Sequence, residues 1–170
     1  MEPNTETTTF SAVTDRQRPI REWCRQLNDP TSGDARYMNE STIHALRGAL
    51  DADNPKSTSF TLMLMHTLRH PHMSVEDMIS YDPERAIMAD PTYARTMLDR
   101  TGIDRALLKR ADSDLQALAT YPDARSNAFA IRTYIAYLLN DERLKQFAEY
   151  GDKATGINAI MGFVAAHPID

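Results

Sequence analysis

The sequence predicts an all-α protein, a compact multi-helix bundle of about eight or nine short helices joined by turns rich in proline, glycine and aspartate. Seven of the nine prolines stand where a periodic apolar run begins or ends. Proline is accepted at the first helical position but disrupts a helix further in. Apolar residues recur every three or four positions, and the alternation typical of a half-buried strand is absent. Together these patterns favour helices throughout.

Composition and length indicate one domain. The chain has 170 residues, of which 42% are hydrophobic and 25% charged, as is typical of a globular protein. Residues 1–14 are rich in threonine and nearly without apolar side chains, so we expect a disordered N-terminal tail. No linker interrupts residues 15–170, which we expect to form a single helical domain.

The first helix is expected over residues 15–28, and it is amphipathic. At about 100° per residue, Arg18, Arg21 and Arg25 form a stripe on one side. The other side carries the apolar residues Ile20, Trp23, Cys24 and Leu27. Such a stripe is most often a solvated helix face, although it can also contact an acidic partner or a nucleic-acid backbone.

The next two helices are expected over residues 41–50 and 57–70. The first is capped by Asn39 or Ser41. Its inward-facing residues should be Ile43, Leu46 and Leu50. In the second helix the run FTLMLM is apolar on nearly every side, which indicates a helix surrounded by others. We therefore expect residues 57–70 to be the central helix.

Three short helices are expected in the middle of the chain, over residues 74–80, 83–89 and 91–101. The second and third begin at Asp-Pro pairs, where the carboxylate caps the helix and proline presets φ. Gly102 should end the third helix in a left-handed conformation.

The C-terminal part should contain four further helices. The first begins after Asp104, ends at Tyr121-Pro122 and carries the apolar stripe Leu107, Leu108, Ala111, Leu115 and Leu118. The others are expected over residues 123–140, 141–150 and 154–166.

The most specific local pattern is TMLDRTGIDRALLKR, which starts at Thr96. A DNA-binding helix-turn-helix needs a glycine at the turn, then an apolar residue, a polar cap and an apolar packing residue. These places are filled by Gly102, Ile103, Asp104 and Leu108. If residues 96–116 form this motif, the second helix should expose to DNA the side chains of Arg105, Lys109, Arg110, Ser113 and Gln116.

Three residues count against DNA binding. Leu98 is large for a close helix crossing, and Asp112 and Asp114 place negative charge on the second helix. Any all-helical protein also turns corners with a glycine and a capping aspartate. An ordinary helical corner is therefore the favoured interpretation, and DNA binding is the alternative.

A histidine cluster is a second candidate site. His66 and His70 are four residues apart on one helix face, and His72 follows shortly after, a spacing that can bind a metal. Two histidines without a fixed third ligand do not make a closed metal site. Core packing, with the histidines near a helix end, is the favoured interpretation.

Motifs of known enzymes are absent from the sequence. It contains no glycine-rich phosphate loop, dinucleotide fingerprint, GxSxG, HExxH or CxxC pattern. Cys24 is expected to be a small core residue rather than a nucleophile. The acidic pairs Asp51/Asp53 and Asp112/Asp114 are expected in or near solvated segments. We therefore expect neither catalysis nor a cofactor.

The expected function is that of a non-enzymatic interaction or regulatory protein acting through protein–protein contacts, with Arg18, Arg21 and Arg25 as candidate partner-binding residues. The alternative is a DNA-binding regulator that uses residues 96–116. A net charge of −5 argues against coating of nucleic acid or anionic membranes. No membrane-spanning stretch and no secretory signal is recognisable, and there is one cysteine, so a cytoplasmic location is expected.

Overall fold

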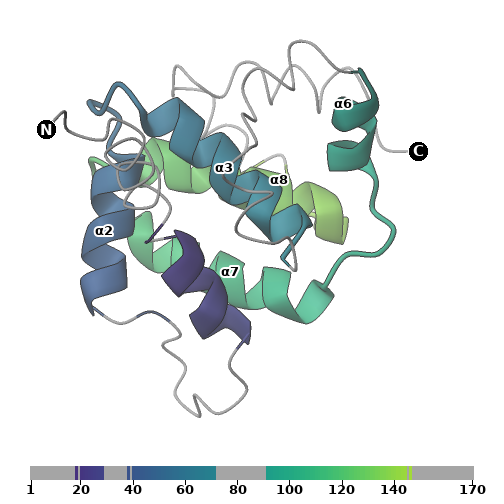
Figure 1. The fold of residues 1–170 in the computed structure, drawn as a ribbon, viewed down its shortest axis with the longest axis horizontal. Helices are drawn as coiled ribbons and strands as arrows, with labels where there is room; N and C mark the ends of the chain where they lie inside the picture. Colours follow the sequence, from purple (N-terminus) through teal and green to yellow (C-terminus); the bar gives the residue numbers. More distant parts are fainter. Residues whose placement is uncertain are drawn as a thin grey trace, which may run out of the picture.

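The computed structural model describes residues 18, 20–28, 38, 40–71, 91–144 and 146. Within these ranges it contains six helices and no strand, which confirms the all-α class. The helices are residues 20–28, α2 (Glu40–Leu50), α3 (Ser57–Arg69), α6 (Pro91–Leu98), α7 (Arg105–Leu118) and α8 (Arg125–Leu139) (Figure 1).

The total of eight or nine helices is not confirmed. The expected tail 1–14 and the helices expected over residues 74–80, 83–89 and 154–166 lie outside the described residues. Of residues 141–150, only 141–144 and 146 are described.

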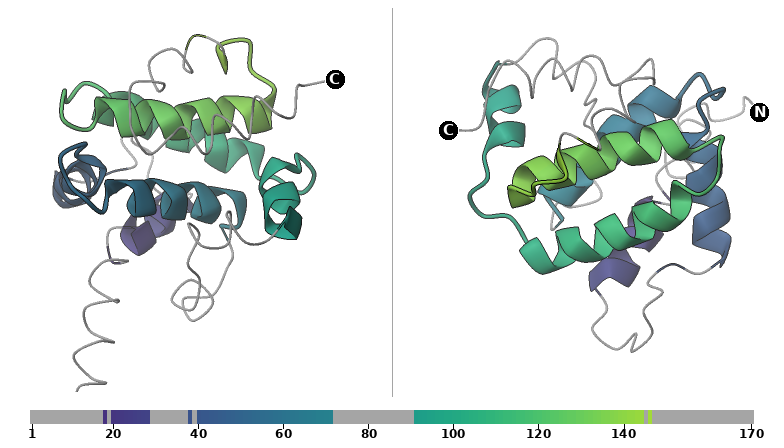
Figure 2. Two further views of the ribbon diagram at one scale, coloured as in Figure 1. Left: turned by 90° about the horizontal axis from the view of Figure 1, so that it is seen from above. Right: turned by 180° about the vertical axis from the view of Figure 1, so that it is seen from behind.

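The centre of the fold is the antiparallel pair of α7 and α8, which lie side by side in Figure 2. Asp104 caps α7 as the sequence predicts, because its Oδ1 accepts a hydrogen bond from the Leu107 amide at 3.0 Å. α8 ends at Asn140, whose φ of 54° is the left-handed conformation that terminates many helices. A short turn that includes Pro122 joins the pair.

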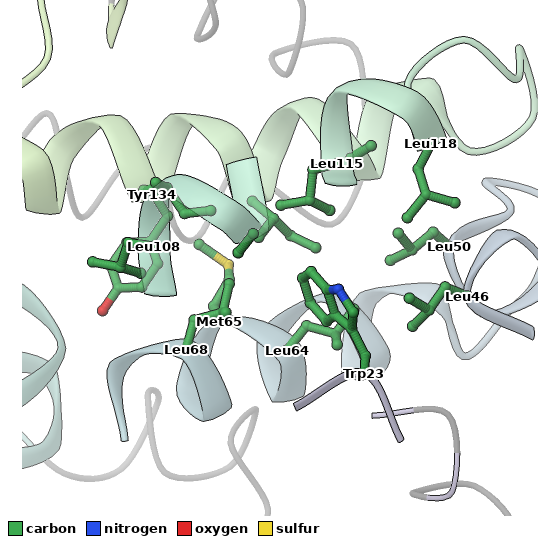
Figure 3. Close-up of a cluster of buried hydrophobic side chains, with 14 of the residues drawn as sticks. Trp23, Leu46, Leu50, Leu64, Met65, Leu68, Leu108, Leu115, Leu118 and Tyr134 are labelled. Carbon is green, nitrogen blue, oxygen red and sulfur yellow. The ribbon is translucent and has the colours of Figure 1, made fainter. Parts of the chain in front are cut away.

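The remaining helices surround this pair. α3 packs against both α8 and α2. α2 and α6 stand at opposite ends of the bundle, α2 at the left and α6 at the right of Figure 1. Figure 3 shows the ring of Trp23, from helix 20–28, among leucines of the core. The largest side chains with almost no exposure include Trp23, Leu46, Leu50, Leu64, Leu108, Leu115 and Leu118.

α3 is surrounded as the sequence predicts, because every residue from Ser57 to Arg69 is buried or half-buried, and α8 is enclosed to a similar degree. From Asn127 to Leu138 every residue of α8 except the half-buried Phe129 is buried. The polar members are satisfied inside the protein: Asn127 donates to the Leu50 carbonyl at 2.8 Å, and Thr133 donates to the Phe129 carbonyl at 2.7 Å. In the sequence these polar residues resemble an exposed helix face, so the apolar pattern alone does not predict that α8 is enclosed as fully as α3.

Two local expectations are also corrected. Ile43 is half-buried, whereas Thr42 and Ala49 are the buried companions of Leu46 and Leu50 on α2. α6 ends at Leu98, so Gly102 does not cap it directly, although Gly102 does have the expected positive φ of 68°.

Candidate functional site

The arginine stripe lies on the exposed side of helix 20–28. Arg18, Arg21 and Arg25 are all exposed, while Trp23 and Leu27 on the other side are fully buried. Arg25 forms an exposed ion pair with Glu22 at 2.6 Å, which lowers the pKa of that carboxyl mainly through its hydrogen bond. The amphipathic pattern expected for this helix is therefore confirmed.

Two long-range hydrogen bonds hold this helix against α7. The indole Nε1 of Trp23 donates to Asp114 Oδ2 at 2.8 Å, and Arg110 donates to the Leu27 carbonyl at 2.7 Å. A third contact joins helix 20–28 to α2, where Gln26 donates to Thr42 Oγ1 at 3.2 Å. Polar contacts to two different helices fix the orientation of the helix and, with it, the direction in which the arginines point.

The residues of the DNA-binding hypothesis are only partly on one surface. Arg105, Lys109, Ser113 and Gln116 are exposed on α7. Arg110 is half-buried, and its guanidinium is bound to the carbonyl of Leu27, so the expectation that it is exposed is wrong. The reason is its place at the edge of the buried leucine stripe, under helix 20–28.

The connection between α6 and α7 also differs from a compact helix-turn-helix. Residues 99–104 separate the two helices, whereas the motif uses a turn of about three or four residues. Other helices hold this connection: Arg69 of α3 donates to the carbonyls of Asp99 and Thr101, at 3.0 and 2.9 Å. Arg100 donates to the Tyr137 carbonyl of α8 at 2.9 Å. The corner is thus anchored on α3 and α8.

The structure describes two residues of the histidine cluster, His66 and His70. His66 is buried, and burial together with the charge of His70 lowers its pKa to about 4. The two rings lie 4.9 Å apart, and His72 lies outside the described residues. Within the described ranges, no three His, Cys, Asp or Glu side chains converge as metal ligands would.

The pair Asp112/Asp114 corrects the expectation that both acidic pairs lie in or near solvated segments: the Asp112 side chain is only 13% exposed and is paired with Arg132, and Asp114 is buried. Asp114 is only 5% exposed. Burial raises the pKa of its carboxyl to about 6, and the hydrogen bond from Trp23 lowers this pKa by a smaller amount. Position 114 follows Leu107 by seven residues and Ala111 by three, so it falls on the inward stripe of α7. This spacing is the sequence signal that identifies Asp114 as buried.

The buried Asp114 carboxyl makes stability depend on pH. Because its pKa is 3.8 ordinarily and about 6 in the folded protein, the folded state binds more protons between about pH 4 and pH 6. Rising pH across this window should therefore remove about 3 kcal/mol from the free energy of unfolding. Urea denaturation at several pH values, followed by circular dichroism, measures this effect.

The control for this prediction is Asp114→Asn, which cannot titrate. His66 acts in the opposite direction, because its lowered pKa contributes stability that is lost as pH falls from 6.5 towards 4. This contribution is common to both proteins and cancels in their difference. The stability of the variant relative to the natural chain should rise with pH, and parallel pH profiles would contradict the assignment.

Comparisons of the chain with protein-family models, with curated proteins and with solved structures return no match. None of the described helices combines the length and the apolar composition that crossing a lipid bilayer requires.

Proposed function

We propose that this chain is a non-enzymatic interaction or regulatory protein that acts by contacting a protein partner with an acidic surface. The observation that carries the proposal is the exposed arginine row of Arg18, Arg21 and Arg25 on a helix whose opposite side is fixed to the bundle. Arginine is enriched in protein interfaces, and its planar guanidinium binds carboxylates in a bidentate way. A preoriented row loses less entropy on binding than a mobile one.

The surrounding charge supports an acidic rather than a basic partner. The protein as a whole carries a net charge of −5, so a cationic row is a local departure from its overall charge. Complementary charge at an interface raises the association rate and selects against like-charged surfaces. We further propose a cytoplasmic location, which suits a chain whose single cysteine, Cys24, has no partner for an internal disulfide.

Charge reversal of the arginine row tests this function. The variant Arg18→Glu/Arg21→Glu should retain at least about tenfold less of the partner in affinity capture from native lysate, because two attractive contacts become repulsive. The matched control is Lys56→Glu/Arg95→Glu, which makes the same change in net charge at two exposed positions on other elements. Equal capture by both variants would contradict the proposal.

We keep a DNA-binding regulator as the second candidate, because α7 presents a row of side chains suited to it. Lys109, Ser113 and Gln116 follow each other at spacings of four and three residues and are all exposed. Arg105 is exposed at the capped start of the helix, where it donates to the Leu139 carbonyl at 3.2 Å. These four side chains have the chemistry to contact phosphates and base edges.

Duplex binding distinguishes the two candidates. If α7 binds DNA, fluorescence anisotropy at low salt should detect duplex binding that weakens steeply as salt is added. In Arg105→Ala/Lys109→Ala, the slope of log affinity against log salt concentration should then decrease by an amount that corresponds to about two phosphate contacts. Lys56→Ala/Arg95→Ala is the charge-matched control. Absence of duplex binding at low salt eliminates the DNA candidate.

A further inference from the structure

A cleft of about 370 Å³ lies between α2 and the second half of α7. Its volume is within the range of small-molecule sites, which are mostly apolar with a few convergent polar groups. The lining has this composition, with apolar side chains from Met38, Ile43 and Ala117, hydroxyl groups from Ser113 and Thr120, the ring of Tyr121, and the carboxyl group of Asp114.

The carboxyl group of Asp114 has unused hydrogen-bonding capacity at this cleft. Its Oδ2 accepts the hydrogen bond from Trp23, and among the described residues no donor reaches Oδ1. Although Asp114 is only 5% exposed, its Oδ1 is not fully buried. An ionisable group enclosed by protein, with one acceptor atom open to a cleft, is a typical feature of binding sites.

The charge beside the cleft favours a cation. A buried carboxylate is stabilised by an opposite charge within hydrogen-bond distance. The neighbouring Arg47 stacks on the Tyr121 ring at 4.3 Å but is paired with Asp123 at 3.0 Å, so its charge is balanced. We infer that the cleft binds a small organic amine whose ammonium group donates to Asp114 Oδ1 and whose apolar body contacts Met38 and Ile43.

The fluorescence of Trp23 can report binding in the cleft. This residue is the only tryptophan of the chain, and its indole is hydrogen-bonded to the carboxyl group that should hold the ammonium. Titration with cyclohexylmethylamine at mildly alkaline pH should change the Trp23 fluorescence in a saturable way, with one site per chain by calorimetry. Cyclohexylmethanol, which has the same apolar body without the charge, should bind at least about tenfold more weakly.

Two variants locate the binding. Asp114→Asn removes the charge but retains an acceptor for Trp23, and it should weaken amine binding at least about tenfold. Ala117 is exposed and lines the cleft, so Ala117→Phe should block the site without disturbing the core. Ala106→Phe, at an exposed alanine of the same helix away from the cleft, is the matched control and should bind as the natural chain does.

Three results would overturn this inference: no saturable amine binding into the millimolar range, equal binding of the alcohol, or amine binding that Asp114→Asn and Ala117→Phe leave unchanged. The test is independent of the proposed partner contact, because Arg18 and Arg21 do not line the cleft. Arg18→Glu/Arg21→Glu should therefore bind the amine normally while losing the partner.

Discussion

Replacing Asp112 by alanine is expected to lower the free energy of unfolding by about 3 kcal/mol, since breaking a buried ion pair leaves a buried charge poorly compensated. Asp112 of α7 accepts from Arg132 of α8 at 2.8 Å, and the side chains are only 13% and 6% exposed. Arg143 lies at 3.6 Å from the same carboxylate. The pair thus joins the two helices at the centre of the fold, and urea denaturation followed by circular dichroism measures its loss.

The exposed pair between Arg25 and Glu22 is the matched control. Their side chains are 64% and 39% exposed, and Glu22→Ala should change stability by less than about 1 kcal/mol. The double variant Asp112→Ala/Arg132→Met should recover part of the loss, because an apolar pair no longer leaves a charge in the interior. Equal effects of Asp112→Ala and Glu22→Ala would show that the buried pair does not join α7 to α8 energetically.

Replacing Trp23 by alanine is expected to cost about 3 to 5 kcal/mol, the range for removing a large aromatic side chain from a core. Trp23 is fully buried among side chains of α3 and α7, as Figure 3 shows, and it is the donor to Asp114. Chemical denaturation followed by circular dichroism measures the loss. Because Trp23 is one of the residues that connect helix 20–28 to the bundle, amide exchange within this helix should also accelerate.

A smaller substitution separates packing from hydrogen bonding. Trp23→Phe keeps an aromatic ring in the core but removes the donor to Asp114, at a cost of about 1 to 3 kcal/mol. In a double-mutant cycle with Asp114→Ala, which removes the acceptor, the coupling energy should be at least about 0.5 kcal/mol. Additive effects would mean that the indole contributes by volume alone.

The helices whose ends follow local rules could be predicted from the sequence. Asp104 caps α7, and the expected boundaries of residues 41–50 and 57–70 agree with α2 and α3 to within one residue. The start of α7 depends on its cap, and α3 ends shortly before Pro71; both rules act within a few residues of the chain. The end of α6 was misplaced, because residues 99–101 are held by hydrogen bonds from α3, a contact that no local pattern encodes.

The candidate site was predictable where exposure depends on one helix alone. The arginine row follows from helical periodicity, and its exposure is confirmed. Arg110 and Asp114 differ from the sequence prediction, because each forms a hydrogen bond with a partner that is distant in sequence. Those partners, Leu27 and Trp23, lie 83 and 91 residues away along the chain. Long-range pairs of this kind arise only when the helices pack.

Site-specific photo-cross-linking in the native cell tests the proposed partner surface most directly. Asn28 is exposed and follows Arg21 by seven residues on the same helix side, so p-benzoylphenylalanine at position 28 probes that surface while all three arginines remain. The account predicts a covalent adduct with a specific protein from position 28 and none from the exposed position 95 on α6. Equal adducts from both positions, or adducts from position 28 with nucleic acid alone, would contradict it.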